Sequence, residues 1–195
     1  MKRGLKMTSA VDDKLAGALA LAVAQKPRAN LQQIARMAGI SKATLYRIAP
    51  TREGVVEMLL ERCTRHMQDA LTGADLESPP FHSALERLTE GVMKERAFYL
   101  FWNAALWMDL NDARNDELHG YGASFYSDAL EKFFLNGQKA GVFRIDMPAK
   151  WLAKAYDFLL YAAIESAQRG EIASVGMSTM VDKMFLDGAI SESAR

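Results

Sequence analysis

Four side chains that can donate hydrogen bonds fall within six consecutive residues, the segment KATLYR at 42–47. Lys42 and Arg47 carry positive charges, and Thr44 and Tyr46 carry hydroxyl groups. Such groups bind phosphate oxygens, and several of them also bind the edges of bases in the major groove of DNA. We expect Lys42 and Thr44 to contact base edges. The alternative is an ordinary solvated helix face in some other small helical bundle.

The flanking residues predict two short helices joined by a turn of about four residues. Asn30 is a good N-cap for the first helix, and Gln33 stands where the partner of a capping box would lie. Gly39 suits a backbone that leaves the helix with positive φ. Ser41 can cap the second helix, and Pro50 stops it.

Small and apolar residues in this stretch have the spacing that two steeply crossing helices need. Such a crossing requires a small residue at the contact, an apolar residue after the turn and apolar anchors on the second helix. These positions are filled by Ala35, Gly39, Ile40, Leu45 and Ile48. The pattern predicts a helix-turn-helix whose second helix presents the four donors to a partner.

The segment IARMAGISKATLYRIAPTREGVV resembles the helix-turn-helix and the start of the fourth helix of the TetR-type transcriptional regulators. The resemblance covers roughly residues 12–60, and beyond them it rests on length and helical layout. Ala49 stands where that family usually has Phe, and Arg52 where it usually has a phosphate-contacting Lys. We expect DNA contacts from Asn30, Ser41, Lys42, Ala43, Thr44, Tyr46, Arg47 and Arg52, with Tyr46 and Arg52 as positioning contacts.

The charge of the chain is divided between its two parts. Residues 1–52 hold ten Lys or Arg and two Asp, a net charge of +8, and the remaining residues hold 14 basic and 22 acidic side chains, a net charge of −8. A basic head on an acidic body is typical of a DNA-binding domain joined to a separate partner domain.

The remainder of the chain predicts further helices and no strand, so the expected fold is all-α. A long helix is predicted from Thr51 to about Thr72, with others from Phe81 to about Asp109 and over about 121–140, and two at the C-terminal end. We expect a DNA-binding domain at 1–52 and a ligand-binding and dimerisation domain at 53–195. The resemblance implies a homodimer formed through the last two helices, double-stranded DNA with a palindromic operator as partner, and regulation by a small molecule.

Aromatic residues crowd the middle of the body and are candidates for the walls of a pocket that takes an apolar or aromatic effector. At each single position, plain hydrophobic core is the more frequent explanation. Trp102 and Tyr126 stand out because each joins a polar group to a large apolar surface. The full set is Phe98, Trp102, Trp107, Tyr121, Phe125 and Tyr126.

Other chemistry has little support in the sequence. The single cysteine, Cys63, excludes an internal disulfide and lies on the apolar stripe of its helix. The three histidines are scattered without a second ligand at metal spacing, and no nucleophile elbow or phosphate-binding glycine loop occurs. We therefore expect no metal, no cofactor and no catalytic residue. The acidic residues between 109 and 117 could attract a cationic ligand, although a solvated loop explains them more simply.

The N-terminal residues resemble a signal peptide in part, because Lys2, Arg3 and Lys6 precede the run LAGALALAVA. Asp12 and Asp13 interrupt that pattern, and cleavage would remove the helix that must pack on the helix-turn-helix. No run approaches the roughly 20 apolar residues of a membrane span. We therefore expect a cytoplasmic protein without membrane partners.

Two other classes of function remain open at this stage. A helical ligand-binding protein whose head no longer reads DNA is one, and Ala49 and Gly54 are the features that motivate it. The other is an enzyme built on the helical body. The preferred interpretation is a homodimeric transcriptional regulator, most simply a repressor that its ligand releases from the operator.

Overall fold

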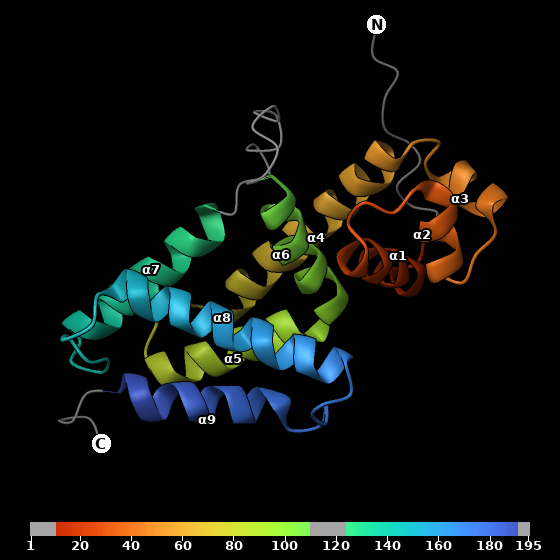
Figure 1. Cartoon of the computed structure of the whole chain (residues 1–195). Coiled ribbons are helices and arrows are strands. Elements are labelled where there is room, and N and C mark those ends of the chain that lie inside the picture. The colour runs from red at the N-terminus through yellow and green to blue at the C-terminus, as the bar shows by residue number, and fades with distance from the viewer. Residues whose placement is uncertain (1–10, 110–123, 191–195) are drawn as a thin grey trace, which may run out of the picture. The chain divides into compact units, whose positions relative to one another are not determined.

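A computed structural model describes residues 11–109 and 124–190, without the side chains of residues 106–109. This part of the chain is helical (Figure 1) and contains no strand beyond an isolated bridge between Phe143 and Ile190. The all-α prediction is therefore confirmed. The helices are α1 (Asp13–Gln25), α2 (Leu31–Met37), α3 (Lys42–Ile48), α4 (Arg52–Ala74), α5 (Phe81–Lys94), α6 (Arg96–Asp109), α7 (Ser124–Lys139), α8 (Ala149–Gln168) and α9 (Met177–Ala189).

The described residues form two compact units, and α4 contributes to both. The first unit contains α1 to α3, the part of α4 up to Arg65, and α6 from Ala97 onwards. The second contains the end of α4 with α5, α7, α8 and α9. The expected functional boundary after residue 52 stays a prediction, because compactness and function need not divide a chain at the same residue.

Buried aliphatic side chains hold the first unit together. Leu19, Ile34, Leu45 and Leu59 are fully buried, so α1, α2, α3 and α4 each contribute to one core. Arg62 of α4 adds polar contacts at its edge: it donates to the Asp13 carboxylate at 2.9 Å and to the carbonyl of Val11.

The predicted burial of Cys63 on α4 is confirmed. Burial raises the pKa of its thiol to about 12, because the thiolate would lose its hydration. The thiol therefore remains protonated and is a packing residue.

Aromatic rings form the centre of the second unit. Neighbouring rings lie 5.0–6.4 Å apart between centroids, mostly edge-on or tilted, the arrangement that aromatic quadrupoles favour. The rings come from α5, α7, α8, α9 and the connector after α7. They belong to Phe81, Phe133, Phe134, Phe143, Tyr156 and Phe185.

The ring of Phe143 lies directly against the backbone of α7 at Gly137. A Cβ atom at position 137 would stand 2.3 Å from Cδ2 of Phe143, well inside van der Waals contact. Glycine in a helix interior costs roughly 0.5–1 kcal/mol relative to alanine. Here it permits the close approach of the connector to the helix.

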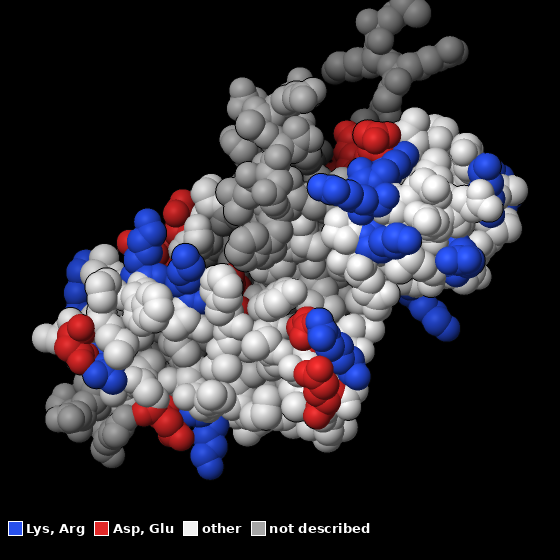
Figure 2. Space-filling model, viewed as in Figure 1, with Lys and Arg blue, Asp and Glu red and all other residues white. Residues whose placement is uncertain are grey.

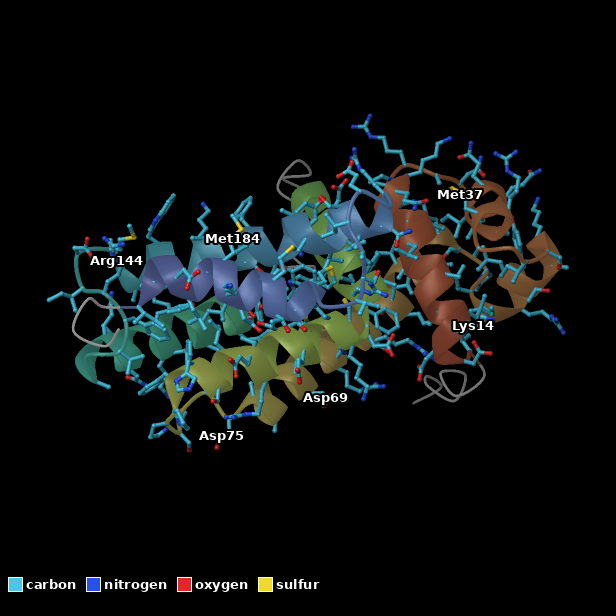
Figure 3. All side chains as sticks on the ribbon, turned by 90° about the horizontal axis from the view of Figure 1, so that it is seen from below. Lys14, Met37, Asp69, Asp75, Arg144 and Met184 are labelled. Carbon is cyan, nitrogen blue, oxygen red and sulfur yellow. The ribbon has the colours of Figure 1, made fainter. Side chains whose placement is uncertain are left out.

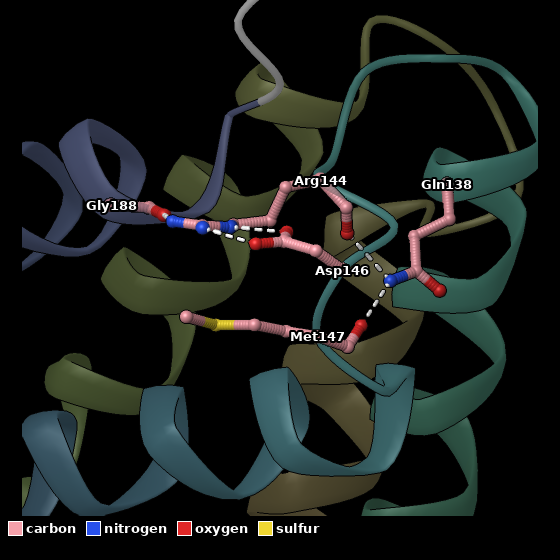
Figure 4. A network of polar contacts seen from close by, with 5 residues as sticks. All are labelled: Gln138, Arg144, Asp146, Met147 and Gly188. Atoms are coloured by element: carbon pink, nitrogen blue, oxygen red, sulfur yellow. Dashed lines mark hydrogen bonds and ion pairs between the residues drawn. The ribbon is translucent and has the colours of Figure 1, made fainter.

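Polar contacts fix the connector between α7 and α8 (Figure 4). The side-chain amide of Gln138 donates to the carbonyls of Arg144 and Met147, each at 2.7 Å. Arg144 pairs with Asp146 and donates through Nη1 to the carbonyl of Gly188 at 3.0 Å, near the end of α9. The pKa of the Asp146 carboxyl is lowered, because it accepts hydrogen bonds from Arg144. The connector is thereby joined to two helices.

Within the described residues, no helix is long and apolar enough to cross a membrane.

Candidate nucleic-acid interface

The helix α2 begins with the predicted capping box. The backbone N–H of Gln33 donates to Oδ1 of Asn30 at 3.0 Å, and the backbone N–H of Asn30 donates to Oε1 of Gln33 at 3.1 Å. Ile34 and Ala35 are buried on the inner face. Asn30 thus has a structural task at the start of α2, independent of any DNA contact.

The turn after α2 depends on Gly39. Its φ is +72°, a conformation that residues with a Cβ rarely adopt, and no atom lies within 4 Å of the place where a Cβ would stand. The backbone conformation alone therefore requires glycine. The N–H of Ile40 donates to the carbonyl of Ala35 at 3.0 Å and closes the turn.

The helix α3 is capped by Ser41, as predicted. Ser41 Oγ accepts from the backbone N–H of Thr44 at 3.0 Å and shares a hydrogen bond with its Oγ1 at 2.8 Å. The Thr44 hydroxyl, expected at a base edge, is therefore engaged with the cap and half-buried. Leu45 anchors the opposite side of α3 in the core.

Four residues of α3 remain exposed, as a surface for DNA requires: Lys42, Ala43, Tyr46 and Arg47. The Lys42 ammonium lies 5.3 Å from the centre of the Tyr46 ring, a cation–π distance. Tyr46 is 43% exposed although it is aromatic. These residues could bind phosphates and base edges, and whether they do stays a prediction.

Arg52 differs in its surroundings from the exposed residues of α3. It is half-buried at the start of α4, and its guanidinium donates to the carbonyl of Pro27 in the loop between α1 and α2. This bond spans 25 residues of sequence. Arg52 therefore has a structural partner besides its predicted contact with phosphate.

Ala49 and Gly54, the two residues that motivate the alternative of a head that no longer reads DNA, lie close together. Ala49 is buried, and its Cβ is 3.5 Å from the place where a Cβ of Gly54 would stand. Thr51 caps the start of α4 by accepting from the backbone N–H of Gly54 at 3.0 Å. Small side chains at both positions let the end of α3 and the start of α4 approach each other.

Exposed cations surround the helix-turn-helix. Figure 2 shows lysine and arginine side chains over the region of α1, α2 and α3. The exposed cations of the described head outside α3 are Lys14, Lys26, Arg28 and Arg36. Their charge favours a polyanion at this surface.

The aromatic residues predicted for a ligand pocket fall into three groups. Phe98 and Trp102 are buried on α6, and Tyr126 is buried on α7 with Phe125 half-buried beside it in sequence. The two pairs belong to different units. The side chain of Trp107 and the whole of Tyr121 lie outside the described residues, as does the acidic segment from Asp112 to Glu117.

The Tyr126 hydroxyl is the unusual member of this set. It is buried and has no hydrogen-bond partner within the described part of the chain. Burial raises its pKa well above the ordinary tyrosine value, and the neighbouring Tyr156 and Asp157 act in the same direction. Among the described residues, this neutral donor has no acceptor.

Comparison with known proteins gives a consistent result, although no family model matches the chain. The HTH-type transcriptional regulator NfxB of Pseudomonas aeruginosa is 36% identical over 180 residues, which cover 91% of this chain and 94% of NfxB. The HTH-type transcriptional repressor LfrR of Mycolicibacterium smegmatis is 27% identical over 154 residues, covering 77% of this chain and 75% of LfrR.

Solved structures agree with this relationship at the level of the fold. The crystal structure of the TetR-like regulator LfrR from Mycobacterium smegmatis has a TM-score of 0.65 at 21% identity, over 91% of this chain and 95% of that one. LfrR has also been crystallised in complex with proflavine. The chain belongs to the TetR family of transcriptional regulators, which are DNA-binding proteins and not enzymes.

The bond between Arg52 and Pro27 leads to a test that separates structural from DNA-contacting residues. Arg52→Ala should lower the free energy of unfolding by about 1–2 kcal/mol, because the variant has no charged donor for this carbonyl in a half-buried place. Arg47→Ala removes an exposed arginine and should change it by less than about 0.5 kcal/mol. Urea unfolding of both variants measures the difference, and equal stabilities would assign no structural role to Arg52.

Proposed function

We propose that the protein is a homodimeric regulator that binds a palindromic operator through α3 and leaves it when a small molecule binds the body. The observation that best supports DNA binding is that α3 is anchored on one side and exposes hydrogen-bond donors on the other. Its cap and its Leu45 anchor fix the helix, while Lys42, Tyr46 and Arg47 remain exposed in a head of net charge +8. Repression as the sign of regulation is supported by LfrR, whose name describes a repressor.

The proposed contacts divide into two kinds. Arg47 and Tyr46 are suited to phosphates, and they would set the register of α3 on the duplex. Lys42 and Ala43, in the first turn of α3, are suited to base edges and to the methyl group of thymine. Two such helices related by a two-fold axis would read half-sites about 34 Å apart, one helical turn of DNA.

Selection of bound fragments from random DNA tests this proposal. The wild-type protein should enrich a palindromic site, with an affinity that falls steeply with salt. Arg47→Ala should weaken binding to every sequence and lower the slope of log affinity against log salt by about 1 for each phosphate that a dimer subunit no longer binds. Lys42→Ala should cost about 1–3 kcal/mol and relax the preference at one position of each half-site.

Lys139→Ala is the matched control, because it removes an exposed cation at the end of α7 in the other unit. It should leave DNA binding unchanged. If no sequence is enriched and all three variants bind DNA alike, the alternative of a ligand-binding protein with a degenerate head is correct.

The proposed dimer surface consists of exposed apolar side chains on α8 and α9: Trp151, Phe158, Met180 and Met184, which are 44–65% exposed. The same helices bury their other faces through residues such as Leu152, Tyr156, Val181 and Phe185. Figure 2 shows an uncharged area over the middle of α8 and α9, and Figure 3 shows Met184 pointing away from the helices. A second copy of the chain would cover this surface.

Substitution of this surface by charge tests the dimer. Phe158→Glu and Met184→Glu should each raise the dissociation constant of the dimer at least about tenfold, because a charge must be buried where an apolar side chain packed. Leu135→Glu on α7, where the leucine is 43% exposed, is the control and should leave the dimer intact. Sedimentation velocity over a range of concentrations measures the constants, and a wild-type monomer at every concentration would exclude the proposal.

The proposed ligand contact is the hydroxyl of Tyr126. A buried hydroxyl without a partner costs about 1–3 kcal/mol, and a ligand that offers an acceptor would recover this free energy. Tyr156 lies near Tyr126, and an aromatic neighbour favours an apolar or aromatic ligand. Because LfrR binds proflavine, this planar aromatic molecule is the first probe.

Tyr126→Phe tests the contact in two ways. Without ligand, the variant should be more stable to urea by about 1 kcal/mol, since the unpaired hydroxyl is gone. With proflavine, titrated by calorimetry in the absence of DNA, it should bind about two- to tenfold more weakly than the wild type. Tyr46→Phe on the exposed face of α3 is the control. A variant that is less stable and binds proflavine equally well would exclude Tyr126 as a ligand contact.

The proposed response to ligand runs through α4, which contributes residues to both units. A ligand that prefers one setting of this helix would shift the chain towards it and change the separation of the two α3 helices. The shift is limited to the difference in ligand affinity between the two settings.

A further inference from the structure

Three polar side chains meet inside the helical core of the second unit. They come from different helices: Thr89 from α5, Tyr156 from α8 and Asp182 from α9. Thr89 and Tyr156 are fully buried, and Asp182 is 6% exposed. An aspartate in such a place is rare unless it is paired or has lost its charge.

The hydroxyl oxygen of Thr89 is the centre of this group. It lies 3.0 Å from the carbonyl oxygen of Leu85 and 2.9 Å from the hydroxyl oxygen of Tyr156, and it also contacts Oδ1 of Asp182. A threonine hydroxyl has one proton to donate and two lone pairs that accept. Three contacts therefore require one donated and two accepted hydrogen bonds.

Counting protons distinguishes the two charge states of Asp182. The Leu85 carbonyl can only accept, so it takes the Thr89 proton, and Tyr156 can donate its own proton to Thr89. An ionised Asp182 can also only accept, and it would compete with Leu85 for the same proton. A protonated Asp182 donates to Thr89 instead, and all three hydrogen bonds then form together.

The charged groups around Asp182 also favour its protonated state. Glu86 and Glu90 of α5 carry the same charge as an ionised Asp182 and oppose its ionisation. Tyr156 faces Asp182 from α8. In the part of the chain that the structure describes, Asp182 has no ion-pair partner. Burial is the largest cause of the raised pKa of Asp182, about 6, and the two glutamates raise it further. The Thr89 hydroxyl opposes them, because it can donate a hydrogen bond to the ionised carboxylate. A pKa of about 6 lies at the edge of the physiological range.

We propose that Asp182 is a proton-binding site, which holds α9 on α5 when it is protonated and weakens this contact when it is ionised. The proton is exchanged with solvent, and no other group is consumed. Ionised, Asp182 leaves one buried acceptor without a donor and places a negative charge beside Glu86 and Glu90.

The site has a consequence for assembly that rests on the proposed dimer. Asp182 lies on the inner side of α9, and Met180 and Met184 project from the same helix. If α9 packs differently on α5, the positions of Met180 and Met184 in the proposed dimer surface change as well. We expect the dimer to dissociate more readily as the pH rises from about 5 to about 7.

Urea unfolding across pH tests the proton site directly. The folded carboxyl holds its proton up to about pH 6, whereas the unfolded one releases it near its ordinary value of 3.8. The folded state therefore binds more protons between these values, and this contribution to stability is complete below about pH 4 and lost as pH rises through about 6. The difference between the folded and unfolded pKa values of Asp182 corresponds to about a hundredfold increase in the unfolding equilibrium constant as the pH rises through this range.

Asp182→Asn isolates this contribution, because the amide can donate to Thr89 but does not titrate. Between about pH 4 and about pH 7, the unfolding equilibrium constant of the wild type should rise about a hundredfold relative to that of Asp182→Asn. Asp69→Asn, an exposed aspartate of α4 (Figure 3), is the matched control and should follow the wild type. A parallel pH dependence of Asp182→Asn and the wild type would overturn the proposal.

The wild-type protein supplies an independent reading, which holds even if Asp182→Asn fails to fold. The carboxyl carbon of Asp182, followed by nuclear magnetic resonance, should titrate with a midpoint near about pH 6, and a midpoint near about pH 4 would overturn the proposal. Sedimentation of the same samples measures the dimer. A chain that is monomeric at every pH refutes the dimer, while the two titrations still decide whether Asp182 binds the proton.

Discussion

The burial of Leu45 is the contact on which the DNA-binding head depends. A helix of seven residues is not stable in water by itself, since too few hydrogen bonds offset the cost of nucleation. The helix α3 is therefore stabilised by the enclosure of Leu45 in the core and by Ser41, which accepts from the backbone N–H of Thr44. The exposed face of α3, which carries Lys42, Tyr46 and Arg47, is therefore held in place by these two residues.

The local features of the head could be predicted from the sequence. The capping box of Asn30, the positive φ of Gly39 and the cap of Ser41 each depend on residues three or four positions apart, and such short-range rules are contained in the sequence itself. The order and type of the helices follow from apolar periodicity in the same way. The helix predicted over about 121–140 occurs at Ser124–Lys139, close to its predicted limits.

The contacts that could not be predicted join residues far apart in the sequence. Arg52 meets Pro27 across 25 residues, and Thr89 meets Asp182 across 93. The family resemblance suggested a phosphate contact for Arg52, and only the fold shows the carbonyl of Pro27 beside it. Met177, Met180 and Val181 have the spacing of one helix face, but spacing alone does not show that Met177 and Val181 are buried whereas Met180 is exposed.

The contact between Gly137 and Phe143 has a consequence for sequence variation. Since the ring occupies the space where any side chain at position 137 would begin, the two positions form a single steric unit. A relative with a larger residue at the helix position must carry a smaller one on the connector, or lead the connector along another path. These two positions should therefore vary together among related chains, and the pair would indicate which relatives share this course of the chain between α7 and α8.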